Sequence, residues 1–168
     1  GDLWIAAEAP KGQSGLYRYD LASGKGEPIG GSTAVVFALE VDQDDVWAGA
    51  ARYGLFRYRA GKSLENSTFE STSGGLRANT VFSIFTDREG VKWFGTNRGV
   101  SRYDEQAAFQ TPVSDVPNRN FIRTLWQSSD GRFMLAGSNR GLFNLEGPDW
   151  KPLPALSEKA IYAISRNG

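Results

Sequence analysis

The 168-residue sequence contains no cysteine and no histidine, and Met134 is its one methionine. The lack of cysteine excludes disulfides, thiol nucleophiles and thiolate metal sites. The lack of histidine excludes Ser-His-Asp catalysis and removes the ligand that most transition-metal sites use. We therefore expect neither a metal site nor a cofactor, and we expect that the protein is not an enzyme.

An excess of charge and a long apolar run are also missing. The 19 basic and 19 acidic residues give a formal net charge of zero, whereas proteins that coat nucleic acids usually carry a strong basic excess. No stretch reaches the roughly 18 apolar residues that a transmembrane helix needs. We therefore expect no nucleic acid partner and no membrane insertion by this segment. Because the sequence begins with Gly1-Asp2 and has no signal peptide, we also expect a piece of a longer chain.

The 20 glycines suit a fold with a turn every few residues. The stretch Thr80–Asp104 shows this organisation most clearly, because β-branched and aromatic runs alternate with turn residues. Asp87–Gly90 and Asn97–Gly99 are the two predicted turns. The predicted strands between and around them are Val81–Phe85, Val91–Thr96 and Val100–Tyr103.

Weaker copies of this unit fill the rest of the sequence. They cover Leu3–Asp20, Thr33–Tyr58 and Phe121–Leu145, and Ala160–Gly168 matches the first strand alone. The anchor position of the second strand, held by Trp4, Trp47, Trp93 and Leu135, recurs about every 44 residues, a period typical of propeller blades. We expect the three tryptophans to pack between blades rather than to bind a ligand.

The predicted fold is all-β, a β-propeller of about four four-stranded blades in one domain. The blades are expected over residues 33–79, 80–120 and 121–159, and over 160–168 joined with 1–32. In the last of these, the terminal strands would complete one blade. Three arrangements stay open: a four-bladed ring closed by one chain, an eight-bladed ring of two chains, or a segment of a longer propeller.

The pattern over Val81–Asp104 resembles the two-component regulator propeller repeat. Val46–Tyr58 and Leu135–Leu142 match it more loosely, with Leu135 in place of tryptophan. Propellers of that family form the periplasmic sensor part of bacterial signalling proteins, and several respond to oligosaccharides. The resemblance therefore implies a non-catalytic ligand-sensing module in signal transduction, located in the periplasm or outside the cell, that binds a small anionic or sugar-like ligand.

Arginines recur in the turn between the second and third strands, at Arg52, Arg98 and Arg140. Repeat symmetry places these turns on one rim, where guanidinium forks would suit carboxylate, sulfate or phosphate. The alternative is that each arginine pairs within its own blade or only solvates a turn. Neighbouring turn and crossing-loop residues complete the predicted ligand-binding set: Asn97, Asn139, Arg77, Arg119 and Asn120.

Arg123 is a separate candidate, because it interrupts an inner strand where the other copies have Phe37, Phe82 and Tyr162. A charge at this position needs water or a carboxylate, so it faces the channel or an acidic partner. The acidic cluster of Asp42, Asp44 and Asp45 is expected to be a surface turn. The alternative function is a structural module that assembles with other proteins or closes a ring by oligomerisation. A glycosidase that uses a carboxylate pair is a distant third.

Overall fold

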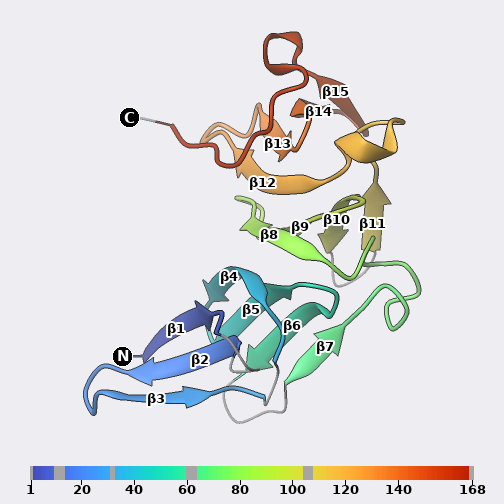
Figure 1. Cartoon of the computed structure of the whole chain (residues 1–168). Coiled ribbons are helices and arrows are strands. Elements are labelled where there is room, and N and C mark those ends of the chain that lie inside the picture. The colour runs from blue at the N-terminus through green and yellow to red at the C-terminus, as the bar shows by residue number, and fades with distance from the viewer. Residues whose placement is uncertain (1, 10–13, 31–32, 60–63, 104–107, 167–168) are drawn as a thin grey trace.

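The computed structural model describes residues 2–9, 14–30, 33–59, 64–103 and 108–166 (Figure 1). These residues form four antiparallel sheets, and the all-β prediction is confirmed. Blade 1 contains β1 (Asp2–Ala7), β2 (Gly15–Asp20) and β3 (Lys25–Pro28). Blade 2 contains β4 (Val36–Asp42), β5 (Asp45–Ala50), β6 (Gly54–Arg59) and β7 (Glu65–Ser67).

Blades 3 and 4 have four strands each, in the same order along the chain. Blade 3 contains β8 (Val81–Thr86), β9 (Lys92–Thr96), β10 (Gly99–Tyr103) and β11 (Ala108–Thr111). Blade 4 contains β12 (Ile122–Gln127), β13 (Met134–Ser138), β14 (Gly141–Glu146) and β15 (Asp149–Pro152). The short 3-10 helices η1 (Pro117–Arg119) and η2 (Pro154–Leu156) lie in the crossing segments before β12 and after β15.

The four blades are stacked in chain order (Figure 1), and their first strands pack on one another, β4 against β8 and β8 against β12. Each apolar cluster spans two blades. Leu16 of blade 1 meets Val46 of blade 2, and Trp47 of blade 2 meets Phe94 of blade 3. The side chains of Trp47 and Trp93 are 4% and 7% exposed, which confirms their predicted place in the core. This arrangement agrees with a propeller-like fold of about four blades.

Three glycines allow the blades to approach closely. A Cβ atom on Gly49 would lie 2.7 Å from Cγ1 of Val81, and one on Gly95 would lie 2.8 Å from Cγ2 of Ile122. At Gly137 the equivalent neighbour is Cγ2 of Ile161, at 2.7 Å. Ile161 therefore takes the place beside blade 4 that the first strands take beside blades 2 and 3.

The chain ends differ from the prediction of a blade completed by both termini. Blade 1 has three strands, and residues 160–166 lie at the opposite end of the stack (Figure 1). Hydrogen bonds hold this segment on blade 4, because Ile161 N donates to Ser138 O (2.8 Å) and Gly141 N to Lys159 O (2.8 Å). Within the described ranges it does not pair with β1, so the single chain is an open stack. The last two residues of the predicted strand lie outside the described residues.

The expectation of a surface turn at the acidic cluster was wrong for Asp45. Its side chain is buried and accepts hydrogen bonds from Arg57 and Arg59 on the neighbouring strand β6. These two guanidinium groups, with the larger effect from Arg59, hold the pKa of Asp45 well below its ordinary range although burial raises it. Asp45 is therefore the centre of an ionic network rather than a solvated turn residue.

Candidate functional site

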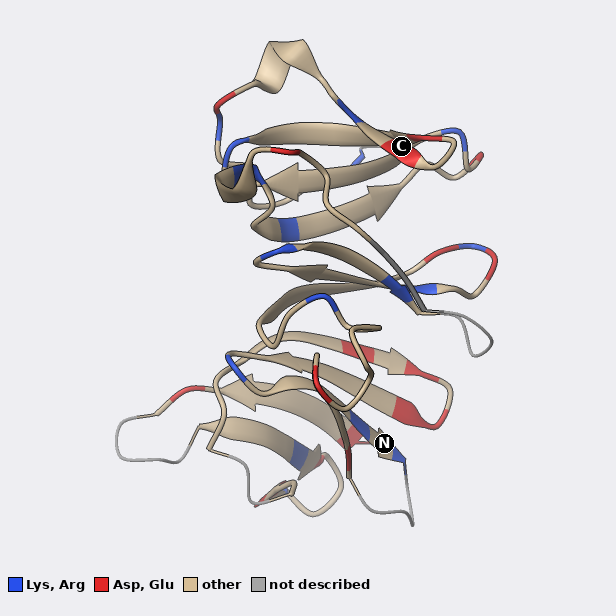
Figure 2. Cartoon of the chain, turned by 90° about the vertical axis from the view of Figure 1, so that its right-hand side faces the viewer, with Lys and Arg blue, Asp and Glu red and all other residues tan. Residues whose placement is uncertain are grey.

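The arginine-bearing turns lie at the same strand ends in blades 2, 3 and 4. They close the pairs Ala50–Gly54, Thr96–Gly99 and Ser138–Gly141. Their backbone amides donate to hydroxyl groups: Arg52 N to Thr80 Oγ1 (3.1 Å), Arg98 N to Thr96 Oγ1 (3.1 Å) and Arg140 N to Ser138 Oγ (3.0 Å). Figure 2 shows basic residues recurring at strand ends along one side of the successive sheets.

Two adjoining hollows open beside these turns, and Arg98 borders both. A hollow of about 260 Å³ is lined by Arg52, Asn97 and Arg98, together with Glu70, Asn79 and Thr80. A hollow of about 430 Å³ is lined by Arg77, Arg98 and Asn120, together with Ser114 and Asp115. We call the residues Arg52, Arg77, Asn97 and Arg98 the arginine rim.

The rim arginines differ in their bonding. Arg77 Nε donates to Arg98 O (2.6 Å), which ties the crossing loop to the turn. Among the ion pairs of the described residues, none includes Arg52 or Arg98. Glu70 accepts a hydrogen bond from Asn79 Nδ2 (2.8 Å), and this bond lowers the pKa of Glu70. In the described part of the chain, Arg52 and Arg98 therefore line these hollows without an ion pair to a carboxylate.

Other predicted site residues are engaged elsewhere. Glu158 binds both Arg119 and Arg140, and the pKa of Glu158 is lowered by the hydrogen bond from Arg119 first. Asn120 is buried, and its Oδ1 accepts from Val113 N (2.7 Å), so it fixes the crossing loop. Asn139 Oδ1 is buried, with no hydrogen bond from a described residue.

Arg123 lies apart from the rim hollows, on the first strand of blade 4. The pairing register shifts at Arg123, at Phe82 and at Phe37, so these three residues stand at the same irregularity in successive blades. The Arg123 guanidinium lies 4.7 Å from the ring centre of Phe121 and 4.8 Å from that of Tyr162. No ion pair among the described residues involves Arg123, so the carboxylate alternative is not observed there, and its guanidinium stacks on the two aromatic rings.

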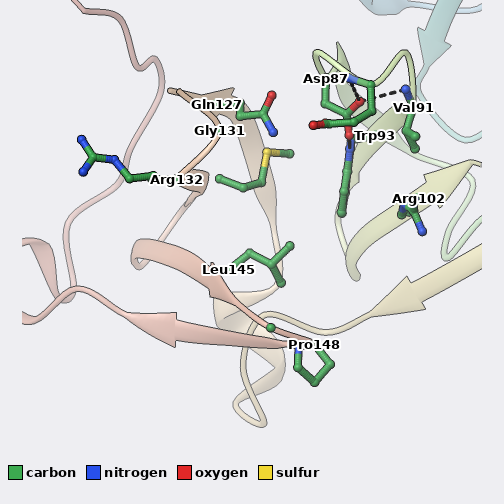
Figure 3. A pocket seen from close by; sticks show the side chains of 12 residues that line it. Asp87, Val91, Trp93, Arg102, Gln127, Gly131, Arg132, Leu145 and Pro148 are labelled. Carbon is green, nitrogen blue, oxygen red and sulfur yellow. Dashed lines mark hydrogen bonds between the residues drawn. The ribbon is translucent and has the colours of Figure 1, made fainter. Parts of the chain in front are cut away.

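The sequence prediction missed a hollow of about 580 Å³ between blades 3 and 4. Figure 3 shows Trp93 and Arg102 of blade 3 on one side and Gln127 and Leu145 of blade 4 on the other. Met134 also lines it. This interblade hollow lies beside the turn from β8 to β9, at the strand ends opposite the arginine rim.

Asp87, at the edge of the interblade hollow, stabilises the turn from β8 to β9. Its Oδ1 accepts from Glu89 N (3.0 Å) and Val91 N (2.9 Å), and its Oδ2 accepts from Trp93 Nε1 (2.7 Å). These bonds fix the turn and the indole ring together. In the part of the chain that the structure describes, no three acidic residues are placed to hold a metal ion, and no helix is long and apolar enough to cross a membrane.

Comparisons with known proteins show the fold. No family model and no curated protein sequence matches the chain. The extracellular domain of the hybrid two-component system BT4673 from B. thetaiotaomicron is 19% identical with a TM-score of 0.71, over 89% of this chain and 20% of that one. The corresponding domain of BT3049 from the same organism is 13% identical with a TM-score of 0.72, over 94% of this chain and 22% of that one.

The computationally designed Ika8 protein is 17% identical with a TM-score of 0.61, over 95% of this chain and 48% of that one. The chain therefore spans about a fifth of the two extracellular domains and about half of the designed protein. At 13–19% identity, these likenesses show a shared fold.

Proposed function

We propose that this chain is part of a non-catalytic sensor propeller, located outside the cytoplasm, that binds a small anionic ligand on the arginine rim. The observation that carries the proposal is the pair of adjoining hollows that share Arg98. The likeness to extracellular domains of two-component systems supports the sensor role.

The chemistry of the rim favours anions with several oxygen atoms. A guanidinium group can bind two oxygens of one carboxylate, sulfate or phosphate. The hollows of about 260 and 430 Å³ are together within the size range of small-molecule sites. Asn79 and Thr80 line the smaller hollow and can bond hydroxyl groups, so a sugar acid would suit it as well as a simple polycarboxylate.

The double substitution Arg52→Ala with Arg98→Ala tests this proposal, with citrate as the ligand and isothermal titration calorimetry as the measurement. We expect the affinity for citrate to fall at least about tenfold, since each charge-assisted bond contributes roughly 1.5–3 kcal/mol. The melting temperature without citrate should stay unchanged, because neither side chain forms an ion pair among the described residues. Arg132→Ala is the matched control, because Arg132 is exposed and binds Asp130 (2.5 Å). Equal citrate binding by wild type and double variant would refute the proposal.

A second candidate function is assembly through the chain ends. Residues 160–166 lie where the first strand of a further blade would lie, and blade 1 has three strands. On this proposal, the segment adds to β1 of a second copy and completes its blade, as expected for a heterologous contact that closes. β1 would gain a partner along its open edge.

The native mass of the 168-residue chain tests this assembly. We expect twice the monomer mass of 18.4 kDa by native mass spectrometry, since two copies would complete each other's blades. Ile161→Asp should shift the mass to that of the monomer, because Ile161 contacts Gly137 at the end of the stack. A wild-type mass of 18.4 kDa at all concentrations would rule out self-assembly.

A further inference from the structure

The repeat places an arginine opposite the anchor tryptophan in three blades. Strand pairing sets Arg18 opposite Trp4, Arg57 opposite Trp47 and Arg102 opposite Trp93. The Arg57 guanidinium lies 4.7 Å from the Trp47 ring centre, and that of Arg102 lies 5.8 Å from the Trp93 ring centre. The three arginines therefore occupy equivalent places, and the blades can be compared with one another.

In blades 1 and 2 an aspartate two residues before the tryptophan binds this arginine. Asp2 Oδ2 lies 2.9 Å from Arg18 Nε, and Asp45 binds Arg57. In blade 3 the same position is Val91, which cannot bind a guanidinium group. No carboxylate among the described residues forms an ion pair with the half-buried Arg102.

The side chain that the following blade places beside the tryptophan also differs between the junction of blades 2 and 3 and the junction of blades 3 and 4. Between blades 2 and 3, Lys92 fills the space beside Trp47, with its Nζ 5.6 Å from the ring centre and 2.8 Å from Asp42 Oδ2. Lys92 directly precedes Trp93, and the residue that directly precedes Leu135 is Met134. At the junction of blades 3 and 4 an uncharged side chain thus replaces the lysine, and the interblade hollow of about 580 Å³ is present.

The other charged groups at the interblade hollow already have partners. Arg132 binds Asp130 (2.5 Å), Glu89 binds Arg88 (3.1 Å), and the oxygens of Asp87 accept the three bonds described above. Arg102 is therefore the cation of the lining that has no ion pair among the described residues. The hollow lies outside the arginine rim, so the two sites are independent.

We infer that the interblade hollow is a binding site for a ligand that carries a carboxylate on an apolar body. The carboxylate of the ligand takes the place at Arg102 that the aspartate side chains take at Arg18 and Arg57. The apolar body lies on Trp93, Met134 and Leu145, which line the hollow. Arg102 and Trp93 line this space on the blade 3 side (Figure 3), and the Gln127 amide of blade 4 is a further polar contact for the ligand.

Phenylacetate is the ligand to test, because it combines a carboxylate with an apolar ring. Acetate and phenylethanol serve as controls that keep only one of the two parts. By nuclear magnetic resonance titration of the wild type, we expect phenylacetate to bind at least about tenfold more tightly than either control, because each part adds its own interaction. Arg102→Gln should abolish this preference.

Val91→Asp tests the inference more specifically than Arg102→Gln does. It keeps Arg102 and places a carboxylate at the position that Asp2 and Asp45 hold in the other blades. We expect this variant to melt at a higher temperature than wild type and to lose phenylacetate binding at least tenfold. The rim variant Arg52→Ala with Arg98→Ala should bind phenylacetate like wild type, which separates this site from the arginine rim. Unchanged phenylacetate binding in Arg102→Gln, or no preference over the controls in wild type, would overturn the inference.

Discussion

Replacing Asp45 with asparagine is expected to lower the free energy of unfolding by about 3–5 kcal/mol, the range for removing one partner of a buried ionic network. Arg59 Nε donates to Asp45 Oδ1 at 2.5 Å, and Arg57 Nε donates to Oδ2 at 2.8 Å. Asparagine keeps the size of the side chain but removes its charge. The two neighbouring guanidinium groups of Arg57 and Arg59 would then lose the carboxylate that binds both of them.

Urea unfolding measures this loss, with Asp149→Asn as the control. Asp149 forms an exposed pair with Lys151 (3.9 Å), so its loss should change stability by less than about 1 kcal/mol. A fall of similar size in both variants would show that the Asp45 network is no stronger than a surface pair.

The pH dependence of stability should identify the same carboxylate. The pKa of Asp45 is lowered in the folded state, chiefly by Arg59 and then by Arg57. Its contribution is therefore complete above the ordinary aspartate pKa of about 3.9 and is lost as the pH falls below that value toward the folded-state pKa. Wild type should lose more stability than Asp45→Asn between about pH 4 and pH 2. Parallel pH profiles would contradict the assignment.

Gly95→Val should disrupt the junction of blades 3 and 4, with a loss of about 3 kcal/mol, the upper part of the usual range for overpacking. A Cβ atom at Gly95 would lie 2.8 Å from Cγ2 and 3.1 Å from the backbone oxygen of Ile122. A side chain could turn away, but the backbone of β12 can move only if blade 4 separates from blade 3.

Thermal unfolding checks this prediction, with Gly26→Val as the control. A Cβ atom at Gly26 would meet its nearest neighbour, Tyr19 Cδ2, at 3.4 Å, which is ordinary contact on an exposed outer strand. We expect the control to melt within a few degrees of wild type. Equal melting temperatures for both variants would mean that the blades are not in close contact at Gly95.

The blade pattern could be predicted because it depends on local sequence. Val81–Thr86, Lys92–Thr96 and Gly99–Tyr103 form strands close to the expected ranges, since short apolar runs and turn residues determine a hairpin with few distant contacts. The repeat pattern marks Ala160–Gly168 as a first strand, and Ile161 takes that place beside blade 4. The pattern does not determine whether this segment also pairs with β1, because that depends on how far the ends of the stack are apart.

The bonding of the site residues was less predictable than their location. The repeat places the turns of Arg52, Arg98 and Arg140 at the same strand ends, but it does not reveal that Glu158 binds Arg140. That contact comes from the crossing loop after η2, where no repeat position is shared. Binding of a ligand at these turns stays a prediction.

One sequence feature indicates the interblade hollow, although the repeat comparison alone does not reveal it: the residue two positions before each anchor tryptophan. Asp2 and Asp45 precede their tryptophans by two residues, and Val91 breaks that rule. The signal becomes meaningful only after the strand register shows that an arginine stands opposite each tryptophan. The error at Asp45 has the same origin, because Arg57 and Arg59 meet it across the hairpin and not along the sequence.

The most direct test of the proposed anion site is nuclear magnetic resonance of the arginine Nε groups while citrate is added. The account predicts selective shifts of the Arg52 and Arg98 signals, which saturate together, while the signal of the paired Arg132 stays in place. Uniform small shifts of all arginine signals, or none at Arg52 and Arg98, would contradict it.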